Sequence, residues 1–288
     1  MEVLSTPLLT YAAQRGVQSR LLLVPRCGHG SFLKLIRSEP SSFIGFLRET
    51  LRVIEEVEGH ENYNLRITAG SLPLRGLEPP AELVEDLARA GFSVSIFADA
   101  ARKREPADAD TLLDLDAAID YQDASGRHVR LPITSGDITL KRGEHTRCAL
   151  DAQGRPVLVV VLERFVRFQR DCSDAELLEL WTLALNVIEE SSGPQEGDPF
   201  VDMRLNAGTF QNIRHLHLKV WLNRKLFEST WAAHPAYKVL AQHRDERRAR
   251  RAARPRDEAD VQTGEERVKM RAAKSTRQYL PRNDSYSQ

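Results

Sequence analysis

The chain lacks the features that would place it in several common protein classes. Its 288 residues include three cysteines, Cys27, Cys148 and Cys172, which are too few and too scattered for a disulfide framework or a metal cluster. No apolar run approaches the roughly 20 residues of a membrane-spanning helix. The 41 basic and 41 acidic residues cancel, so the whole chain has no strong positive field of the kind that attracts nucleic acid. We therefore expect a globular protein of a reducing compartment, with no membrane partner.

The composition that is present is ordinary for a soluble protein. Hydrophobic residues make up 41% and charged residues 28%, and the length allows two modest domains or one larger fold with a tail. No acidic residue lies between Glu2 and Glu39, a bias that organelle transit peptides share. Residues 19–25, however, have the pattern of a buried strand, which favours a folded N-terminus. We expect a cytoplasmic location, with organellar targeting left open.

The most informative stretch of the chain is residues 206–221. Two histidines, His215 and His217, alternate with apolar residues, and Lys219 takes the next alternate position. Side chains alternate between the two faces of a strand at a rise of about 3.3 Å per residue, so these three are expected to share one face. The intervening leucines and valine would face the core. A strand with two imidazoles and an amine on its open face is suited to handling phosphate.

This stretch resembles the signature of the histidine triad (HIT) family of nucleotide hydrolases and transferases. In that signature three histidines alternate with apolar residues after an asparagine, a glycine and a glutamine. Here Asn206, Gly208 and Gln211 stand in that order, and Gln211 lies four residues before His215. The chain departs from the pattern where Lys219 replaces the third histidine, and the spacing from Asn206 to Gln211 is shorter than in common members. The resemblance covers about sixteen residues.

The resemblance implies a role for each motif residue. His217 would be the nucleophile that forms a covalent nucleotidyl-histidine, and His215 would support the phosphate pocket. Lys219 would supply positive charge in place of the third histidine. Its ordinary pKa near 10.4 makes it a poor acid unless it is desolvated. No cofactor and no metal take part in this mechanism. Hydrogen-bond donors to the phosphate oxygens would be Asn206, Gln211 and Asn212.

Other roles for these residues stay open. A His-x-His pair is also half of a common metal site, so a zinc-dependent hydrolase is a weaker alternative, although no close-spaced third ligand accompanies the pair. A purely structural pair is a further alternative. In the family an acidic residue before the central valine-rich strand holds the ribose, and Asp151 is the positional candidate here. Asp151 also stands in a turn sequence, and a turn-forming aspartate is the favoured interpretation.

An internal repeat organises the first 225 residues. The sequence Val-Ile-Glu-Glu occurs at 53–56 and again at 187–190, and an Ala-Gly pair follows each copy. Each copy has the pattern of a strand, a long helix and a second strand. A repeat of this kind constrains the fold, because each copy is expected to form the same structural unit. Where the second copy has His215 and His217, the first has Leu77 and Pro79. By resemblance, the chain is an α+β protein of HIT-like type, with an antiparallel sheet and a long helix in each half and a degenerate first half.

The predicted domains follow from this repeat: a degenerate half at 1–110, a motif-bearing half at 111–232 and a charged tail at 233–288. Helices are expected at 82–90, after the capping-box sequence Ser173 to Glu176, and at 235–254. We expect a strand at 92–97 and hairpins around 121–129 and 149–157. The sequence beyond Pro255 has few apolar residues and is expected to be disordered. The basic cluster at 243–254 could contact RNA or an acidic protein surface.

Two functions are therefore predicted. The first is a hydrolase or nucleotidyl transferase that acts on a nucleoside phosphate conjugate through His217. The alternative is a catalytically inactive protein of the same fold that binds nucleotides or serves as an assembly subunit, within an RNA–protein complex for example. The retained motif residues favour the enzyme. Lys219, the degenerate first half and the charged tail favour the alternative.

Overall fold

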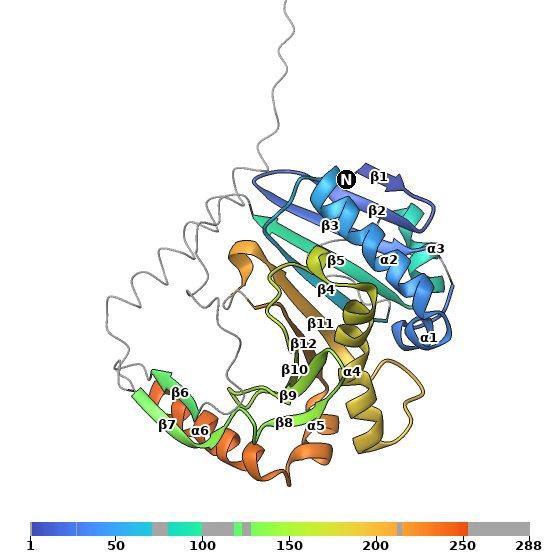
Figure 1. Cartoon of the computed structure of the whole chain (residues 1–288). Coiled ribbons are helices and arrows are strands. Elements are labelled where there is room, and N and C mark those ends of the chain that lie inside the picture. The colour runs from blue at the N-terminus through green and yellow to red at the C-terminus, as the bar shows by residue number, and fades with distance from the viewer. Residues whose placement is uncertain are drawn as a thin grey trace, which may run out of the picture. The chain divides into compact units, whose positions relative to one another are not determined.

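The computed structural model describes residues 2–26, 28–70, 80–99, 118–122, 128–211 and 215–252. Residues up to Arg244 belong to one compact unit, built on an antiparallel sheet of ten strands (Figure 1). The strand order is β1-β2-β3-β5-β4-β11-β12-β10-β9-β8. The strands are β1 (Glu2–Ser5), β2 (Leu9–Gln14), β3 (Gln18–Pro25), β4 (Tyr63–Ala69), β5 (Phe92–Asp99), β8 (Thr139–Arg142), β9 (Thr146–Leu150), β10 (Val157–Leu162), β11 (Phe200–Ala207) and β12 (His217–Leu222).

The two halves of this sheet have the same strand order. From the centre outwards the first half runs β4-β5-β3-β2-β1 and the second runs β11-β12-β10-β9-β8. The halves join where β4 and β11 pair antiparallel, with Asn64 opposite Asn206. In both halves the chain passes through a long helix between the third strand of this order and the central one: α2 (Pro40–Arg52) between β3 and β4, and α4 (Asp174–Ser192) between β10 and β11. The expected antiparallel sheet with long helices is confirmed, while the origin of the halves by duplication stays a prediction.

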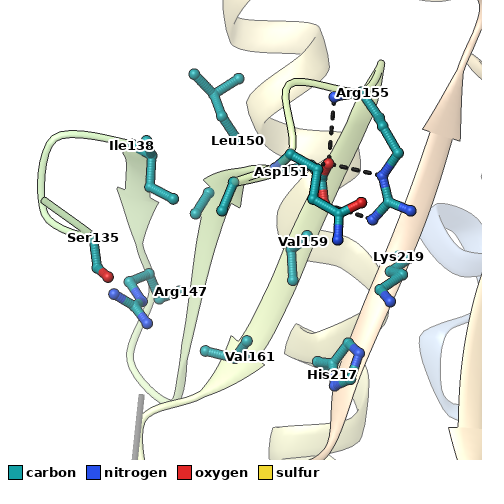
Figure 2. Close-up of a pocket in the computed structure, with 13 residues that line it drawn as sticks. Ser135, Ile138, Arg147, Leu150, Asp151, Arg155, Val159, Val161, His217 and Lys219 are labelled. Carbon is teal, nitrogen blue, oxygen red and sulfur yellow. Dashed lines mark hydrogen bonds and ion pairs between the residues drawn. The ribbon is translucent and has the colours of Figure 1, made fainter. Parts of the chain in front are cut away.

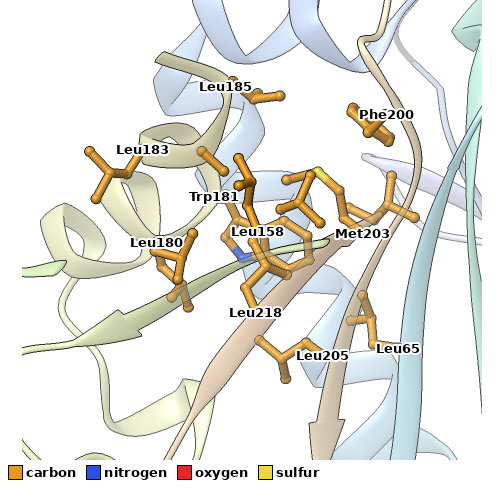
Figure 3. Close-up of a cluster of buried hydrophobic side chains, with 14 of the residues drawn as sticks. Leu65, Leu158, Leu180, Trp181, Leu183, Leu185, Phe200, Met203, Leu205 and Leu218 are labelled. Carbon is orange, nitrogen blue, oxygen red and sulfur yellow. The ribbon is translucent and has the colours of Figure 1, made fainter. Parts of the chain in front are cut away.

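One face of the sheet is buried beneath α2 and α4. Helix α4 begins with the predicted capping box, in which Ser173 accepts the backbone N–H of Glu176 and the Glu176 side chain accepts the N–H of Ser173. Its Trp181 is fully buried and lies over leucines of β10, β11 and β12 (Figure 3). The core extends into the first half, where Phe32 of α1 (Phe32–Ser38) makes an edge-on contact with Phe200 of β11. The helices therefore fix the sheet from one side and leave the other for the site.

The opposite face is covered differently in the two halves. In the first half α3 (Ala81–Ala90) packs Leu83 and Leu87 against Leu22 and Val24 of β3. In the second half the same face carries His217 and Lys219, which lie opposite Val161 and Val159 of β10. The chain adds a hairpin of β6 (Ala118–Gln122) and β7 (His128–Thr134), then α5 (Arg224–Trp231) and α6 (Pro235–Ala252). Of the helices in the described ranges, none is long and apolar enough to cross a membrane.

Most predicted elements are found. The strands at 19–25 and 92–97, the helix at 82–90 and both hairpin pairings are confirmed, with shifts of one or two residues at their ends. The helix from residue 235 is described to Ala252. The positions of Leu77 and Pro79 and the tail beyond residue 252 lie outside the described residues.

Candidate functional site

Strand β12 has the predicted alternation but starts later than expected. Leu218 and Val220 are fully buried, while His217 and Lys219 face the other side of the sheet. The regular strand begins at His217, so the placement of His215 on the same strand is wrong. The backbone N–H of Leu216 donates to the carbonyl of Val166, 2.7 Å away, outside the strand ladder. His215 is buried, and its Nε2 lies 3.0 Å from the carbonyl oxygen of Arg164.

The ring of His217 is held in one orientation. Its Nδ1 lies 2.9 Å from the carbonyl oxygen of His215. A carbonyl can only accept a hydrogen bond, so Nδ1 carries the proton in this contact and Nε2 keeps its lone pair. Burial, and next the charge of Lys219, lower the pKa of His217 to about 4. The imidazole is therefore neutral at pH 7, with Nε2 in the unprotonated form that a nucleophile needs.

His217 lines a cavity of about 270 Å³ on the open face of the second half (Figure 2). Its floor is apolar and formed by Ala149, Val159 and Val161 of β9 and β10. Basic groups stand at two sides of this floor. Lys219 lies beside His217 on β12, and Arg147 lies on β9, two strands away. The cavity is therefore a concave apolar surface with a few polar groups, the usual form of a small-molecule site.

Asp151 closes the end of the cavity next to the β9–β10 turn. Its carboxylate accepts the backbone N–H groups of Gln153 and Arg155 at 3.2 and 3.3 Å, so the predicted turn-forming role is confirmed. The same carboxylate forms a two-point ion pair with the Arg155 guanidinium, with two contacts of 2.8 Å. Asp151 also lines the cavity. A role in holding a ribose stays a prediction, and it would compete with the Arg155 pair.

The environment of Lys219 differs from that of an ordinary surface lysine. Burial, and next the positive charge of Arg155, lower its pKa, while Asp151 acts in the opposite direction. Arg204 of β11 lies opposite Lys219 in the strand register and also lowers the pKa. Two guanidiniums, those of Arg155 and Arg204, lie over the ring of Trp221 at 5.4 and 4.7 Å. Lys219 thus lies near two guanidiniums, each of which is paired with a carboxylate: Arg155 with Asp151 and Arg204 with Asp202.

Arg147 is a cavity residue that sequence reasoning missed. Its side chain is almost fully buried, and its Nε has no hydrogen-bond partner among the described residues. Burial lowers its pKa, and the nearby Glu163 acts against this. The signal in the sequence was weak: a single arginine in the short strand that ends at Asp151, placed so that residues 147, 149 and 151 share a face.

The predicted amide donors lie apart from the cavity. Asn206 is on β11, where its Oδ1 accepts from Nδ2 of Asn64 at 2.5 Å. Gln211 is buried and its Nε2 donates to the carbonyl of Arg167, 2.9 Å away. Neither residue lines the cavity. Asn212 lies outside the described residues. In this structure His217, Lys219 and Asp151 come together at one cavity, while His215, Asn206 and Gln211 do not line it.

The zinc alternative requires further ligands near the histidine pair. Within the ranges that the structure describes, no three side chains of histidine, cysteine, aspartate or glutamate come together in a way that could hold a metal ion. Cys148 and Cys172 are buried in the core, and neither lines the cavity. The described residues around His217 thus offer cationic and apolar groups to a ligand, not a set of metal ligands.

Comparison with known proteins gives matches at the level of structure only. No family model matches the sequence, and no curated protein matches it. Among solved structures, a uridylyltransferase mutant is 12% identical over 81% of this chain and 79% of its own, with a TM-score of 0.43. An ADP-glucose phosphorylase from Arabidopsis thaliana is 10% identical to this chain; the match covers 77% of this chain and 72% of the phosphorylase, with a TM-score of 0.45. A zinc-bound histidine triad family protein from Mycobacterium smegmatis is 17% identical; the match covers 41% of this chain and 88% of that protein, with a TM-score of 0.27.

Proposed function

We propose that the chain binds a nucleoside phosphate conjugate in the cavity beside β12 and transfers or hydrolyses its nucleotidyl group through His217. One observation carries this proposal: a buried, neutral imidazole lines the cavity with Nδ1 fixed by the His215 carbonyl, which leaves Nε2 as the reactive nitrogen. A histidine held in this way next to the ammonium of Lys219 is suited to attack at phosphorus.

The reaction has two steps. In the first, Nε2 of His217 attacks the α-phosphorus, the bond from phosphorus to the leaving group breaks, and the leaving group takes the bonding electrons. In the second, water or another acceptor gives its proton to the Lys219 amine left by the first step and attacks the phosphorus of the nucleotidyl-histidine, which breaks the P–N bond and regenerates the neutral ring. Lys219 stabilises the negative charge on the phosphate oxygens. Because burial lowers the pKa of Lys219, its ammonium is also a better proton donor to the leaving group than an ordinary lysine.

The test is a search for the covalent intermediate. The full-length protein is incubated with a nucleoside phosphoramidate and with diadenosine polyphosphates, quenched, and examined by mass spectrometry. We expect the mass of one nucleoside monophosphate on a peptide containing His217. His217→Asn should abolish it, because the asparagine amide can replace Nδ1 as donor but offers no nucleophile. His128→Asn, at an exposed histidine of the β6–β7 hairpin, is the matched control and should leave it unchanged. Full turnover by His217→Asn would contradict the mechanism.

A specific observation favours the second function, a nucleotide-binding protein without catalysis. The amides expected to hold the phosphate oxygens are engaged elsewhere, Asn206 with Asn64 and Gln211 with the Arg167 carbonyl. A site with fewer donors at the developing charge binds phosphate but stabilises the transition state less. Measurable binding of a nucleoside monophosphate with no turnover of either substrate would support this alternative.

A further inference from the structure

The cavity has a second basic group that the proposed reaction does not use. Arg147 comes from β9 and lies opposite Val161 of β10, which in turn lies opposite His217 of β12. Neighbouring strands are about 4.8 Å apart, so Arg147 and His217 stand about 10 Å apart across the cavity floor. A ligand whose phosphate is held at His217 and Lys219 on β12 can present a different group to Arg147 on β9.

The burial of Arg147 requires an explanation. Almost all of its side chain is removed from water, yet no hydrogen bond or ion pair of its side chain is found among the described residues, and its Nε is both buried and unpartnered. An unpaired buried guanidinium is costly to a folded protein, and such groups are usually satisfied by a partner or a ligand. Arg142 and Arg155, by comparison, both form ion pairs, with Glu163 and Asp151. Besides Lys219, Arg147 is a basic residue of the cavity with no described hydrogen-bond partner, so its donors can reach a ligand.

The surface between the two basic groups determines what reaches Arg147. Ala149, Val159 and Val161 form an apolar floor two strands wide, on which a flat ring can lie. Ile138 adds an apolar wall near Leu150, and Ser135 lies beside Arg147 (Figure 2). A nucleoside whose phosphate contacts His217 and Lys219 would lay its base on this floor and direct the edge of the base at Arg147. The guanidinium has only donors, and it pairs with two adjacent acceptors.

We propose that Arg147 reads the base of the nucleotide and selects guanine, whose O6 and N7 form an edge of two acceptors, over adenine, which presents a donor beside N7. This inference rests on the proposed function, because it assumes that the phosphate lies at His217. Pairing of an arginine with O6 and N7 of guanine is the commonest base-specific contact that arginine makes. Arg147 is thus a specificity-determining residue and takes no part in the chemical steps.

The test measures nucleotide binding by calorimetry with the full-length protein. GMP and IMP, which share O6 and N7, should bind at least about tenfold more tightly than AMP. The analogue 7-deaza-GMP, which lacks one of the two acceptors, should fall between them. Arg147→Met should remove the difference between GMP and AMP and leave AMP binding nearly unchanged. Arg147→Lys should lose most of the preference, because lysine lacks the planar fork.

Two controls separate a binding role from a structural one. Arg20→Met removes an arginine from the same face of the sheet in the other half and should not alter the preference for GMP. The melting temperature without ligand should not fall in Arg147→Met, because the arginine has no described partner to lose and its charge is costly to bury. A large fall in melting temperature would show that Arg147 supports the fold and would overturn its assignment to a ligand.

The outcomes distinguish this inference from the proposed function. Equal binding of GMP and AMP by the wild type, or a preference that survives Arg147→Met, would overturn the base readout alone. If adenosine 3′,5′-bisphosphate binds more tightly than AMP and Arg147→Met removes that difference, Arg147 binds a second phosphate. That result would also overturn the base readout. Failure of all these nucleotides to bind would overturn both the proposed function and the base readout.

Discussion

The buried His217 gives the protein a specific acid sensitivity that can be measured without any substrate. Its pKa falls from an ordinary 6.5 to about 4 in the folded state, mainly because burial disfavours the charged ring. Between these two values the unfolded chain binds a proton at this position and the folded chain does not. Stability contributed by the neutral ring is therefore complete above pH 6.5 and is lost as the pH falls toward 4. The difference between the two pKa values corresponds to about 3 kcal/mol.

The assay is urea unfolding of the wild type and of His217→Asn at about pH 7 and about pH 4.5. Other groups titrate in the same range, but they are shared by both proteins and cancel in the difference. We expect the variant to gain about 2 kcal/mol relative to the wild type on moving to the lower pH. His128→Asn, at the exposed hairpin, is the control and should show no such gain. If the difference in unfolding free energy between the wild type and His217→Asn is the same at both pH values, His217 is not a buried neutral imidazole.

Two further changes test the charge arrangement on this face of the sheet. Lys219→His should raise turnover of a nucleoside phosphoramidate at least about tenfold at pH 7, because an imidazole is the better proton donor near neutral pH. An unchanged or lower rate would show that the lysine is adapted to its own substrate. Asp202→Asn should lower the free energy of unfolding by about 2 kcal/mol in urea titrations. The reason is that the buried carboxylate bridges Arg66 and Arg204 on neighbouring strands. Equal stability of the variant and the wild type would show that these half-exposed arginines need no counter-charge.

Local patterns in the sequence carried much of the fold. The alternation of apolar residues around Lys219 predicted the buried and open faces of β12, and the capping box at Ser173 predicted the start of α4. These signals are short-range, because the period of a strand and the pairing within one helical turn are set by residues close in sequence. The strand order, with β5 and β12 inserted beside earlier strands, depends on long-range pairing. The resemblance implied an antiparallel sheet with a long helix in each half, but neither it nor local propensity gave the order of the strands.

The site was harder to predict than the fold, for a physical reason. The motif identified His217 and Lys219 but carried no information on the partners that neighbouring elements supply. His215 was expected on the strand, yet its ring turns to the Arg164 carbonyl because the backbone at Leu216 bonds to Val166 instead of continuing the ladder. Arg147 reached the cavity through the register of β9 with β10, which no local pattern specifies.

The low pKa of His217 suits a site that takes an anionic substrate. A phosphate next to the ring would favour the protonated imidazole, and an opposite charge within about 4 to 6 Å raises a pKa by roughly one to three units. A histidine with its ordinary pKa would then be largely protonated at pH 7, with no lone pair left to attack. Starting from about 4, the ring stays neutral under all but the largest such shift. Burial and the charge of Lys219, the two leading causes of the low pKa, therefore also keep the proposed nucleophile unprotonated when its substrate binds.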